Sequence, residues 1–232
     1  PDLGPSDLDR LLDESRLDRR AQGLISVPLA DVGTTSITND GTDTTCVVAA
    51  DGDGNVAALI HSLFNEFGSR ELDEPTGVLL NDRLGNQRLA HDGIGGVAPG
   101  AKPLHTLNAV LVLRDGTPAM MATTPGGRGQ VQTLLQVLVN TFDGGVEPQA
   151  AIDAPRWLSG APRRPEPDDQ LYIEPGVPSD VVDQLSERGH HVTVTNDGDV
   201  DMYGSCVAVG TTQTGSLFAA ADSRREAVAM VL

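Results

Sequence analysis

The stretch DTTCVVAADGDGN, Asp43 to Asn55, joins two threonines to a short apolar run and ends in alternating aspartates and glycines. The run TCVVAAD is typical of a β-strand, and Asp-Gly pairs favour the positive φ angles of tight turns. The run that follows, NVAALIHSLF, is again strand-like. We therefore expect a β-hairpin that turns at DGDG, with the two threonines at the start of its first strand.

A calcium loop competes with the turn as an interpretation of DGDGN. Asp51, Asp53 and Asn55 fall at ligand positions 1, 3 and 5 of an EF-hand loop. Such a loop also needs glycine at position 6 and a bidentate glutamate at position 12, and here Val56 and Ser62 stand at those places. A turn requires only glycine and short polar residues, so we prefer the turn.

The two threonines have a chemical interpretation beside the structural one. A threonine hydroxyl needs a base to act as a nucleophile. When threonine begins a chain, its own α-amino group, with a pKa of about 8, can be that base. Enzymes of this kind are precursors that cut themselves just before the threonine. The segment ADVGTTSITNDGTD (residues 30–43) reads as an exposed linker that would suit such a cut. Threonine also begins many strands for propensity alone, so the stretch itself leaves both interpretations open.

The rest of the chain predicts an α+β layered domain. A first helix is expected from a Ser6 cap to Gly23, and a second hairpin in AVLVLRDG and TPAMMATT (109–124). Apolar spacing in QVQTLLQVLVNTFDGG (130–145) predicts a long helix that stops at the glycine pair. Another helix is expected from a Ser179 cap to Gly189, with further strands in HHVTVTN and SCVAVGTTQTGSLFAAA. The Pro-rich stretch 159–170 predicts a surface loop.

The charge of the chain narrows the range of partners. It has 232 residues and a net charge of -17, with 24 Asp, 9 Glu and 15 Arg, and Lys102 is its only lysine. Such a surface repels nucleic acid and anionic membranes, and no run of 18 apolar residues is present to span a bilayer. Dense aspartate with almost no lysine suits high salt, although an ordinary acidic protein is an alternative. The sequence opens with Pro-Asp rather than Met, so we expect a piece of something longer. No signal-peptide pattern occurs in the first forty residues, and we expect a cytoplasmic protein, although targeting information upstream would leave the compartment open.

Cysteine and histidine indicate no metal or cofactor. Cys46 and Cys206 are too few for a disulfide framework, and Cys46 alternates with apolar neighbours, which favours a buried free thiol over a bridge or a nucleophile. The histidines show no metal-ligand spacing with acidic or cysteine partners. We therefore expect neither a metal site nor a cofactor.

Several ordered motifs resemble the γ-glutamyltranspeptidase family, from about Asp43 to Ser223. DTTCVVAADGDGN is similar to its Thr-Thr junction and Asp-Gly-Asn turn, IHSLFNEFGS to its strand ending in Phe-Gly, and TGVLLNDR to its Gly-x-Leu-Leu-Asn segment. KPLHTLNAVLVLRDG resembles its Arg-Pro-Leu-Ser-Ser region, and TTPGG its Pro-Gly-Gly oxyanion motif. QTLLQVLVNTFDGGVEPQAAIDAPRW resembles its helix and Ala-Pro-Arg segment.

The resemblance implies the N-terminal-nucleophile fold, a four-layer αββα sandwich, in a precursor that cuts itself into a large and a small subunit. It implies a cut between Asp43 and Thr44, so that residues 1–43 end the large subunit, most of which is absent here, and 44–232 form the small catalytic subunit. Thr44 would be the nucleophile, the N–H groups of Gly126 and Gly127 would form the oxyanion hole, and Thr45 and Ser62 would supply hydroxyls around the nucleophile. The partners implied are that large subunit and a small amide substrate, and further assembly of such pairs stays open.

The positions that resemble the family's substrate pocket depart from its pattern. Phe64 stands where an asparagine is expected, and Arg83 stands where a glutamine is expected. Asn86 replaces an aspartate that pairs with the ammonium of the γ-glutamyl group. His105 and Thr106 replace two serines that bind its carboxylate. An arginine without that aspartate repels an ammonium and accepts an anionic or neutral acyl group.

The match of the catalytic half without the specificity half resembles the acylase and amidohydrolase branch of the family. We therefore expect a self-processing threonine amidohydrolase or acyltransferase. A true γ-glutamyltransferase that uses glutathione is the alternative enzyme. The alternative that is not an enzyme is a catalytically silent relative with a structural or binding role.

Overall fold

The computed structural model describes residues 44–86, 105–160, 170–196 and 202–231, together with 13–15 and 18. The helix expected at residues 6–23 falls almost wholly outside the described residues, and the expected linker with Asp43 lies outside them entirely. Most of the expected surface loop at 159–170 also lies outside them.

The opening stretch forms the expected β-hairpin. β1 (Thr44–Ala50) pairs antiparallel with β2 (Val56–Ser62), and Thr44 lies opposite Ser62 in the register. In the turn between them, one oxygen of the Asp51 carboxylate accepts hydrogen bonds from the backbone N–H groups of Asp53 and Asn55, at 3.0 and 2.9 Å. These bonds hold the pKa of Asp51 below its usual value, the bond from the Asn55 side chain contributing most. The DGDGN segment therefore closes a hairpin.

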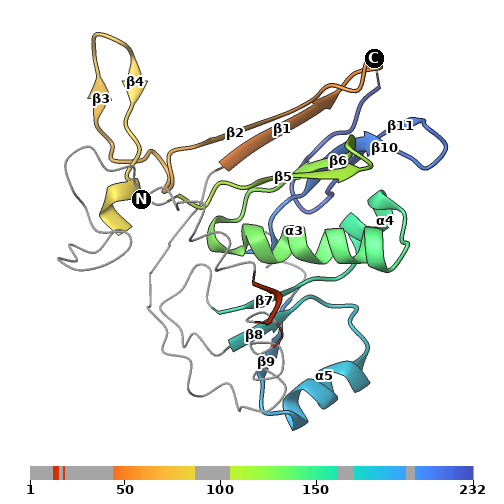
Figure 1. Cartoon of the computed structure of the whole chain (residues 1–232). Helices are drawn as coiled ribbons and strands as arrows, with labels where there is room; N and C mark the ends of the chain where they lie inside the picture. Colours follow the sequence, from red (N-terminus) through yellow and green to blue (C-terminus); the bar gives the residue numbers. More distant parts are fainter. Residues whose placement is uncertain are drawn as a thin grey trace.

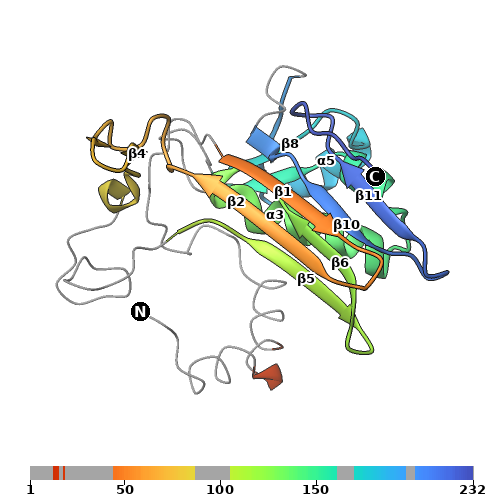
Figure 2. The same ribbon diagram turned by 90° about the horizontal axis from the view of Figure 1, so that it is seen from above.

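The second expected hairpin belongs to a four-stranded antiparallel sheet with the order β11-β10-β6-β5. Its strands are β5 (Ala109–Arg114), β6 (Thr117–Thr123), β10 (Val207–Thr211) and β11 (Leu217–Ala221). The β1–β2 hairpin lies across one face of this sheet, with β1 over β6 and β10 and β2 over β6 (Figure 2). Two β-layers are thus stacked.

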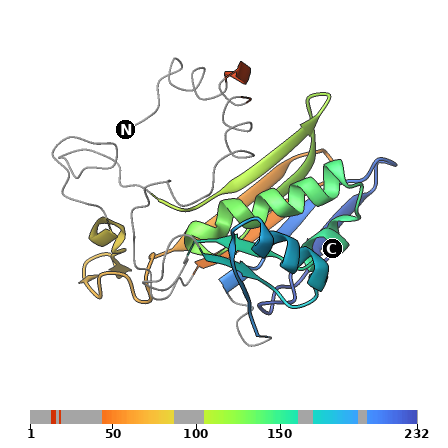
Figure 3. The ribbon, with the colours of Figure 1, turned by 90° about the horizontal axis from the view of Figure 1, so that it is seen from below.

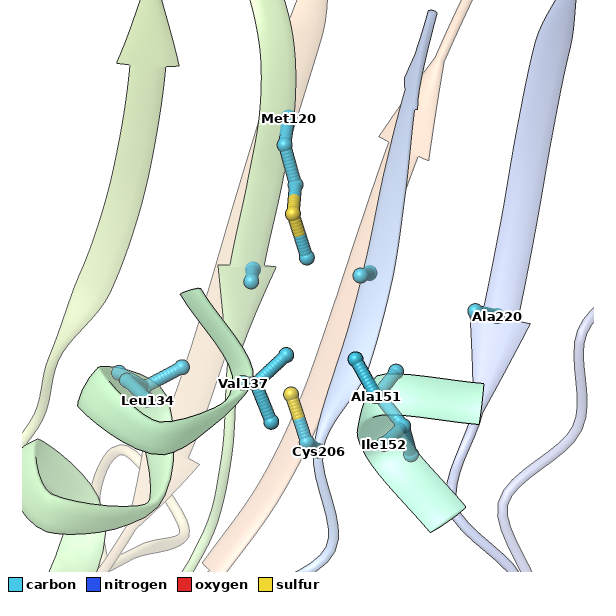
Figure 4. Packing of buried hydrophobic residues seen from close by; sticks show 9 residues of the cluster. Met120, Leu134, Val137, Ala151, Ile152, Cys206 and Ala220 are labelled. Carbon is cyan, nitrogen blue, oxygen red and sulfur yellow. The ribbon is translucent and has the colours of Figure 1, made fainter. Parts of the chain in front are cut away.

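Helices cover the other face of the four-stranded sheet (Figure 3). They are α3 (Gln130–Leu138), which continues in a π-helical turn (Val139–Asp143), and α4 (Pro148–Asp153). Buried side chains between the helices and the sheet form the main hydrophobic core, among them Met120, Leu134, Val137, Ile152 and Cys206 (Figure 4). The helix expected from the spacing of apolar residues after Gly129 is confirmed. The described residues therefore supply three layers in the order hairpin, sheet, helices (Figure 1).

A smaller sheet differs from the expected antiparallel pattern. β7 (Trp157–Ser159) pairs antiparallel with β8 (Gln170–Ile173), but β8 pairs parallel with β9 (His191–Val194). Helix α5 (Ser179–Glu187) connects β8 to β9 and brings the chain back to run in the same direction. The expected cap at Ser179 is wrong, because Pro178 is the N-cap residue and no side chain caps the helix.

A short arm extends from the end of β2 (Figure 1). It contains β3 (Leu72–Asp73), β4 (Val78–Leu79) and a 3₁₀ turn, η2 (Arg83–Asn86). None of the helices in the described part of the chain is long and apolar enough to cross a membrane.

Buried ion pairs join segments that are far apart in the sequence. The guanidinium of Arg156, 2% exposed, contacts the Asp222 carboxylate at 2.6 Å and donates to the backbone carbonyl of Tyr203 at 3.0 Å. Arg224 pairs with Asp222 at 3.1 Å and with Glu174 at 2.6 Å. The ion pairs therefore hold together the segments that follow α4, β8 and β11, and Arg156 ties them to Tyr203, which precedes β10.

Candidate active site

The side chain of Thr44 is held against that of Ser62. Thr44 is 7% exposed, and its Oγ1 donates a hydrogen bond to Ser62 Oγ at 3.0 Å across the first pair of the hairpin. Ser62 Oγ also accepts a hydrogen bond from the backbone N–H of Phe64 at 3.1 Å. The Ser62 hydroxyl therefore fixes the rotamer of Thr44 and the path of the chain as it leaves β2.

A glycine loop leads into α3 at the same end of the sandwich. In all three ribbon views, β1 begins and β2 ends at the end where α3 begins (Figures 1 to 3). Gly126 has φ 131° and ψ 17°, a backbone conformation that glycine adopts without steric cost. Among the described residues, no hydrogen bond acceptor is found for the N–H groups of Gly126 and Gly127. Two backbone donors and the positive end of a helix are therefore available to a developing negative charge.

Gly204 and Thr124 support this loop from the side of β10. A Cβ on Gly204 would lie 2.6 Å from the carbonyl oxygen of Pro125 and 2.6 Å from Thr124 Oγ1. Thr124 Oγ1 donates to that carbonyl at 2.8 Å and accepts from the Ser205 N–H at 3.0 Å. The backbone of Gly204 thus touches the segment that sets the position of Gly126.

The start of α3 is also tied to the segment before β5. Gln130, fully buried, accepts from the backbone N–H of Asn108 through its Oε1 at 3.0 Å. Asn108 in turn donates from its side chain to the carbonyl of Thr106 at 2.6 Å, and its own carbonyl accepts from Thr123 Oγ1 at 2.7 Å. Thr106, half-buried, is therefore placed relative to the glycine loop through Asn108 and Gln130.

Phe64 and Arg83 form a contact just beyond Ser62. Phe64 has φ 83°, which is unusual for a bulky side chain and points to a constrained segment. The carbon at the centre of the Arg83 guanidinium lies 5.4 Å from the centroid of the Phe64 ring. The segment that holds Phe64 and the segment that holds Arg83 are joined by the Asp82 carboxylate, which accepts hydrogen bonds from the backbone and the side chain of Asn65. Burial lowers the pKa of Arg83, and the charge of Asp82 acts in the opposite direction.

The remaining predicted site residues lie as follows. Thr45 is exposed, on the face of β1 opposite to Thr44 and away from the sheet, so its place beside the nucleophile stays a prediction. His105 is exposed in the segment before β5. Asn86 ends η2, and its side chain is outside what the structure describes. Sequence reasoning missed Gly204 and Thr124, whose role depends on contacts across more than 70 residues of chain that no local pattern reports.

Neither cysteine is poised as a nucleophile. Both thiols are free, Cys206 being buried and Cys46 half-buried. Burial raises the pKa of Cys46 to about 11 and that of Cys206 to about 12, so both stay protonated at neutral pH. Across the described ranges, no group of three or more His, Cys, Asp or Glu side chains could hold a metal ion. Among the described residues, neither cysteine therefore competes with Thr44, the nucleophile predicted from the sequence.

Sequence and structure comparisons with known proteins find relatives of one family. A sequence profile described as gamma-glutamyltranspeptidase matches residues 5–232. The glutathione hydrolase-like YwrD proenzyme of Bacillus subtilis is 31% identical over 225 residues, which are 96% of this chain and 41% of that protein. The structure of cephalosporin acylase from Bacillus halodurans matches with a TM-score of 0.71 and 30% identity, over 91% of this chain and 37% of that one.

A second solved structure matches at close to its full length. The γ-glutamyltranspeptidase from Pseudomonas nitroreducens, complexed with L-DON, has a TM-score of 0.66 and 25% identity over 81% of this chain and 99% of that chain. The expected α+β, N-terminal-nucleophile hydrolase fold is confirmed by these neighbours. The chain itself spans less than half the length of the full-length relative and of the acylase.

Proposed function

The chain belongs to the γ-glutamyltranspeptidase family, and on that premise we propose that it is the catalytic part of a self-processing N-terminal threonine amidohydrolase or acyltransferase. The hydrogen bond between the hydroxyls of Thr44 and Ser62 is the observation that carries this proposal. It orients the Thr44 hydroxyl at the start of a strand, where a cut before residue 44 would free an α-amino group on the same residue.

The proposed reaction has two halves. In the first, Thr44 Oγ1 attacks the carbonyl carbon of an amide while the α-amine takes its proton, and the C–N bond breaks as that proton passes to the leaving amine. In the second, water or another amine attacks the carbonyl carbon of the ester on Thr44, and the bond between that carbon and Oγ1 breaks. The α-amine carries the proton of the attacking molecule to Oγ1, and the acyl group leaves as an acid or a new amide. The N–H groups of Gly126 and Gly127 receive the oxyanion in both halves. A donor in such a position contributes about 3 kcal/mol to lowering the barrier.

We propose that residues 1–43 end a large subunit and that 44–232 form the small one. The exposed face of the β1–β2 hairpin supports a covering partner there, because Val47 and Leu59 on that face are 56% and 68% exposed. Large apolar side chains gathered on one sheet face are typical of a surface that another chain covers. The large subunit of the same precursor is the proposed partner.

Two substrate classes follow from the relatives and from the pocket residues. The acylase or amidohydrolase class is favoured, because Arg83 places a positive charge beside Phe64, where the ammonium of a γ-glutamyl group would be repelled. The γ-glutamyl class is the second candidate, favoured by the 31% identity to a relative named glutathione hydrolase-like.

The test uses the full-length precursor, expressed and left to process. Incubation with acyl p-nitroanilides, followed by rapid acid quenching, should add the mass of the acyl group to the fragment that begins at Thr44, and peptide mapping should place it on that residue. Faster turnover of γ-glutamyl-p-nitroanilide than of every acyl p-nitroanilide without an α-amine would support the second candidate. Neither cutting nor acylation under any salt condition would support a silent relative.

A further inference from the structure

Arg83 carries a buried charge whose partner is not found in the described residues. Its side chain is 7% exposed, and its two terminal guanidinium nitrogens make no hydrogen bond to any residue that the structure describes. The Asp82 carboxylate, whose charge acts on Arg83, already accepts hydrogen bonds from the backbone and side-chain N–H groups of Asn65. Among the described residues, the terminal N–H groups of Arg83 are therefore left to donate to a further acceptor.

The physics of arginine makes this arrangement costly without an anion. A guanidinium does not lose its proton in a protein, so Arg83 remains positive although burial lowers its pKa. A buried ion without a partner destabilises a fold strongly, whereas a carboxylate matches the planar fork of arginine with two parallel hydrogen bonds. The face of Phe64, 5.4 Å from the guanidinium, offsets part of the cost by a cation–π contact but accepts none of the hydrogen bonds.

Arg83 is also linked to the nucleophile through a short series of contacts. Phe64 lies against the guanidinium, the Phe64 N–H donates to Ser62 Oγ at 3.1 Å, and Ser62 Oγ accepts from Thr44 Oγ1 at 3.0 Å. A second link runs beside it, since the Asp82 N–H donates to the carbonyl of Leu63 at 3.1 Å. The guanidinium is thus held in a fixed place next to the strand end that carries Ser62.

We propose that Arg83 and Phe64 form a receptor for a carboxylate group on the amide substrate, with the guanidinium binding the carboxylate and the ring packing against the adjoining carbon chain. This inference rests on the proposed function, because it concerns the substrate of the same site. It assigns the enzyme to amides in which one half, acyl or amine, is an anion. Arg83 takes no part in making or breaking the bond.

The experiment measures the preference of the processed enzyme for charged donors. Glutaryl-p-nitroanilide carries a carboxylate on the acyl half, N-pentanoyl-4-aminobenzoate carries one on the amine half, and pentanoyl-p-nitroanilide carries none at the same chain length. The preference is the ratio of kcat/KM for each charged donor to that for the neutral one. It is compared in wild type, Arg83→Gln, Arg83→Lys and Arg114→Gln, an exposed arginine on β5 that serves as the control.

We expect one charged donor to be preferred. Whether its carboxylate lies on the acyl or the amine half then identifies the part of the substrate that Arg83 binds. Arg83→Gln should lower that preference about tenfold to a hundredfold, the range for a hydrogen bond to a charged group. Arg83→Lys should lower it less, and Arg114→Gln should leave it unchanged. Equal rates for charged and neutral donors, or a preference that survives Arg83→Gln, would overturn the inference.

Failure of the proposed function gives a different result. If no donor turns over, calorimetry of glutarate binding to the full-length protein decides the matter by itself. Binding that weakens at least tenfold in Arg83→Gln supports the receptor, and equal or absent binding in wild type and variant contradicts it. An Arg83→Gln variant that loses subunit association while its donor preference is kept would make Arg83 an interface residue and overturn the inference.

Discussion

Substitution of Gly204 by alanine should damage the site from a distance. Gly204 has φ 78°, and an added Cβ would lie 2.6 Å from both the Pro125 carbonyl oxygen and Thr124 Oγ1. Real Cβ contacts essentially never fall below 3.0 Å, so the segment that leads to Gly126 has to move. Alanine in the left-handed region costs about 1–2 kcal/mol, and overpacking adds about 1–3 kcal/mol.

Gly215→Ala is the matched control. Gly215 has φ 86°, and a Cβ there would meet no heavy atom within 4 Å. The Gly215→Ala variant therefore carries the backbone strain of about 1–2 kcal/mol but no steric clash. Gly204→Ala should be less stable than Gly215→Ala by about 1–3 kcal/mol in urea unfolding. Displacement of the proposed oxyanion donors should also lower kcat by about tenfold to a hundredfold for a p-nitroanilide that the wild type turns over. Equal stability and equal kcat in the two variants would refute the support that we assign to Gly204.

Three further changes have defined outcomes. Ser62→Ala removes the acceptor for the Thr44 hydroxyl, so both the rate of self-cutting and kcat should fall about tenfold. Mass spectrometry measures the cutting and p-nitroanilide kinetics measure kcat. Ser69→Ala removes an exposed hydroxyl and should change neither rate. Asp222→Asn leaves the buried Arg156 and the partly buried Arg224 without the carboxylate that they share, and it should lower the free energy of unfolding by about 3–5 kcal/mol in urea. A loss below about 1 kcal/mol contradicts the role of the ion pairs. Cys206 should resist a thiol reagent at pH 8 until the protein unfolds. Burial raises its folded pKa to about 12, above the ordinary thiol value of 9.0, so its contribution to stability should be complete below pH 9 and should fall as the pH rises toward 12. Cys206→Ala should remove that fall.

Local patterns were sufficient to predict the first hairpin and α3. Once the turn is placed at Asp51 to Asn55, antiparallel pairing with equal strand lengths brings Thr44 opposite Ser62. The spacing of apolar residues predicted α3. The oxyanion loop before it was expected only from the resemblance of TTPGG to a Pro-Gly-Gly motif of the family. These are features in which the contacts lie close together in the sequence or follow from a single turn.

Features that depend on distant contacts could not be predicted. Arg156 and Asp222 are separated by 66 residues, and nothing in either neighbourhood indicates that they pair. The parallel pairing of β8 with β9 depends on how α5 packs, and the expectation of a Ser179 cap failed because Pro178 takes that position.

We propose that Thr44 becomes the first residue of a chain and then acts as its nucleophile. The most direct measurement is intact mass and N-terminal sequencing of the full-length protein after expression, in wild type and Thr44→Ala. We expect a wild-type fragment that begins Thr-Thr-Cys-Val-Val and an uncut, inactive Thr44→Ala precursor. A wild-type chain that is cut elsewhere, or a Thr44→Ala precursor that is still cut before residue 44, would contradict this role of Thr44.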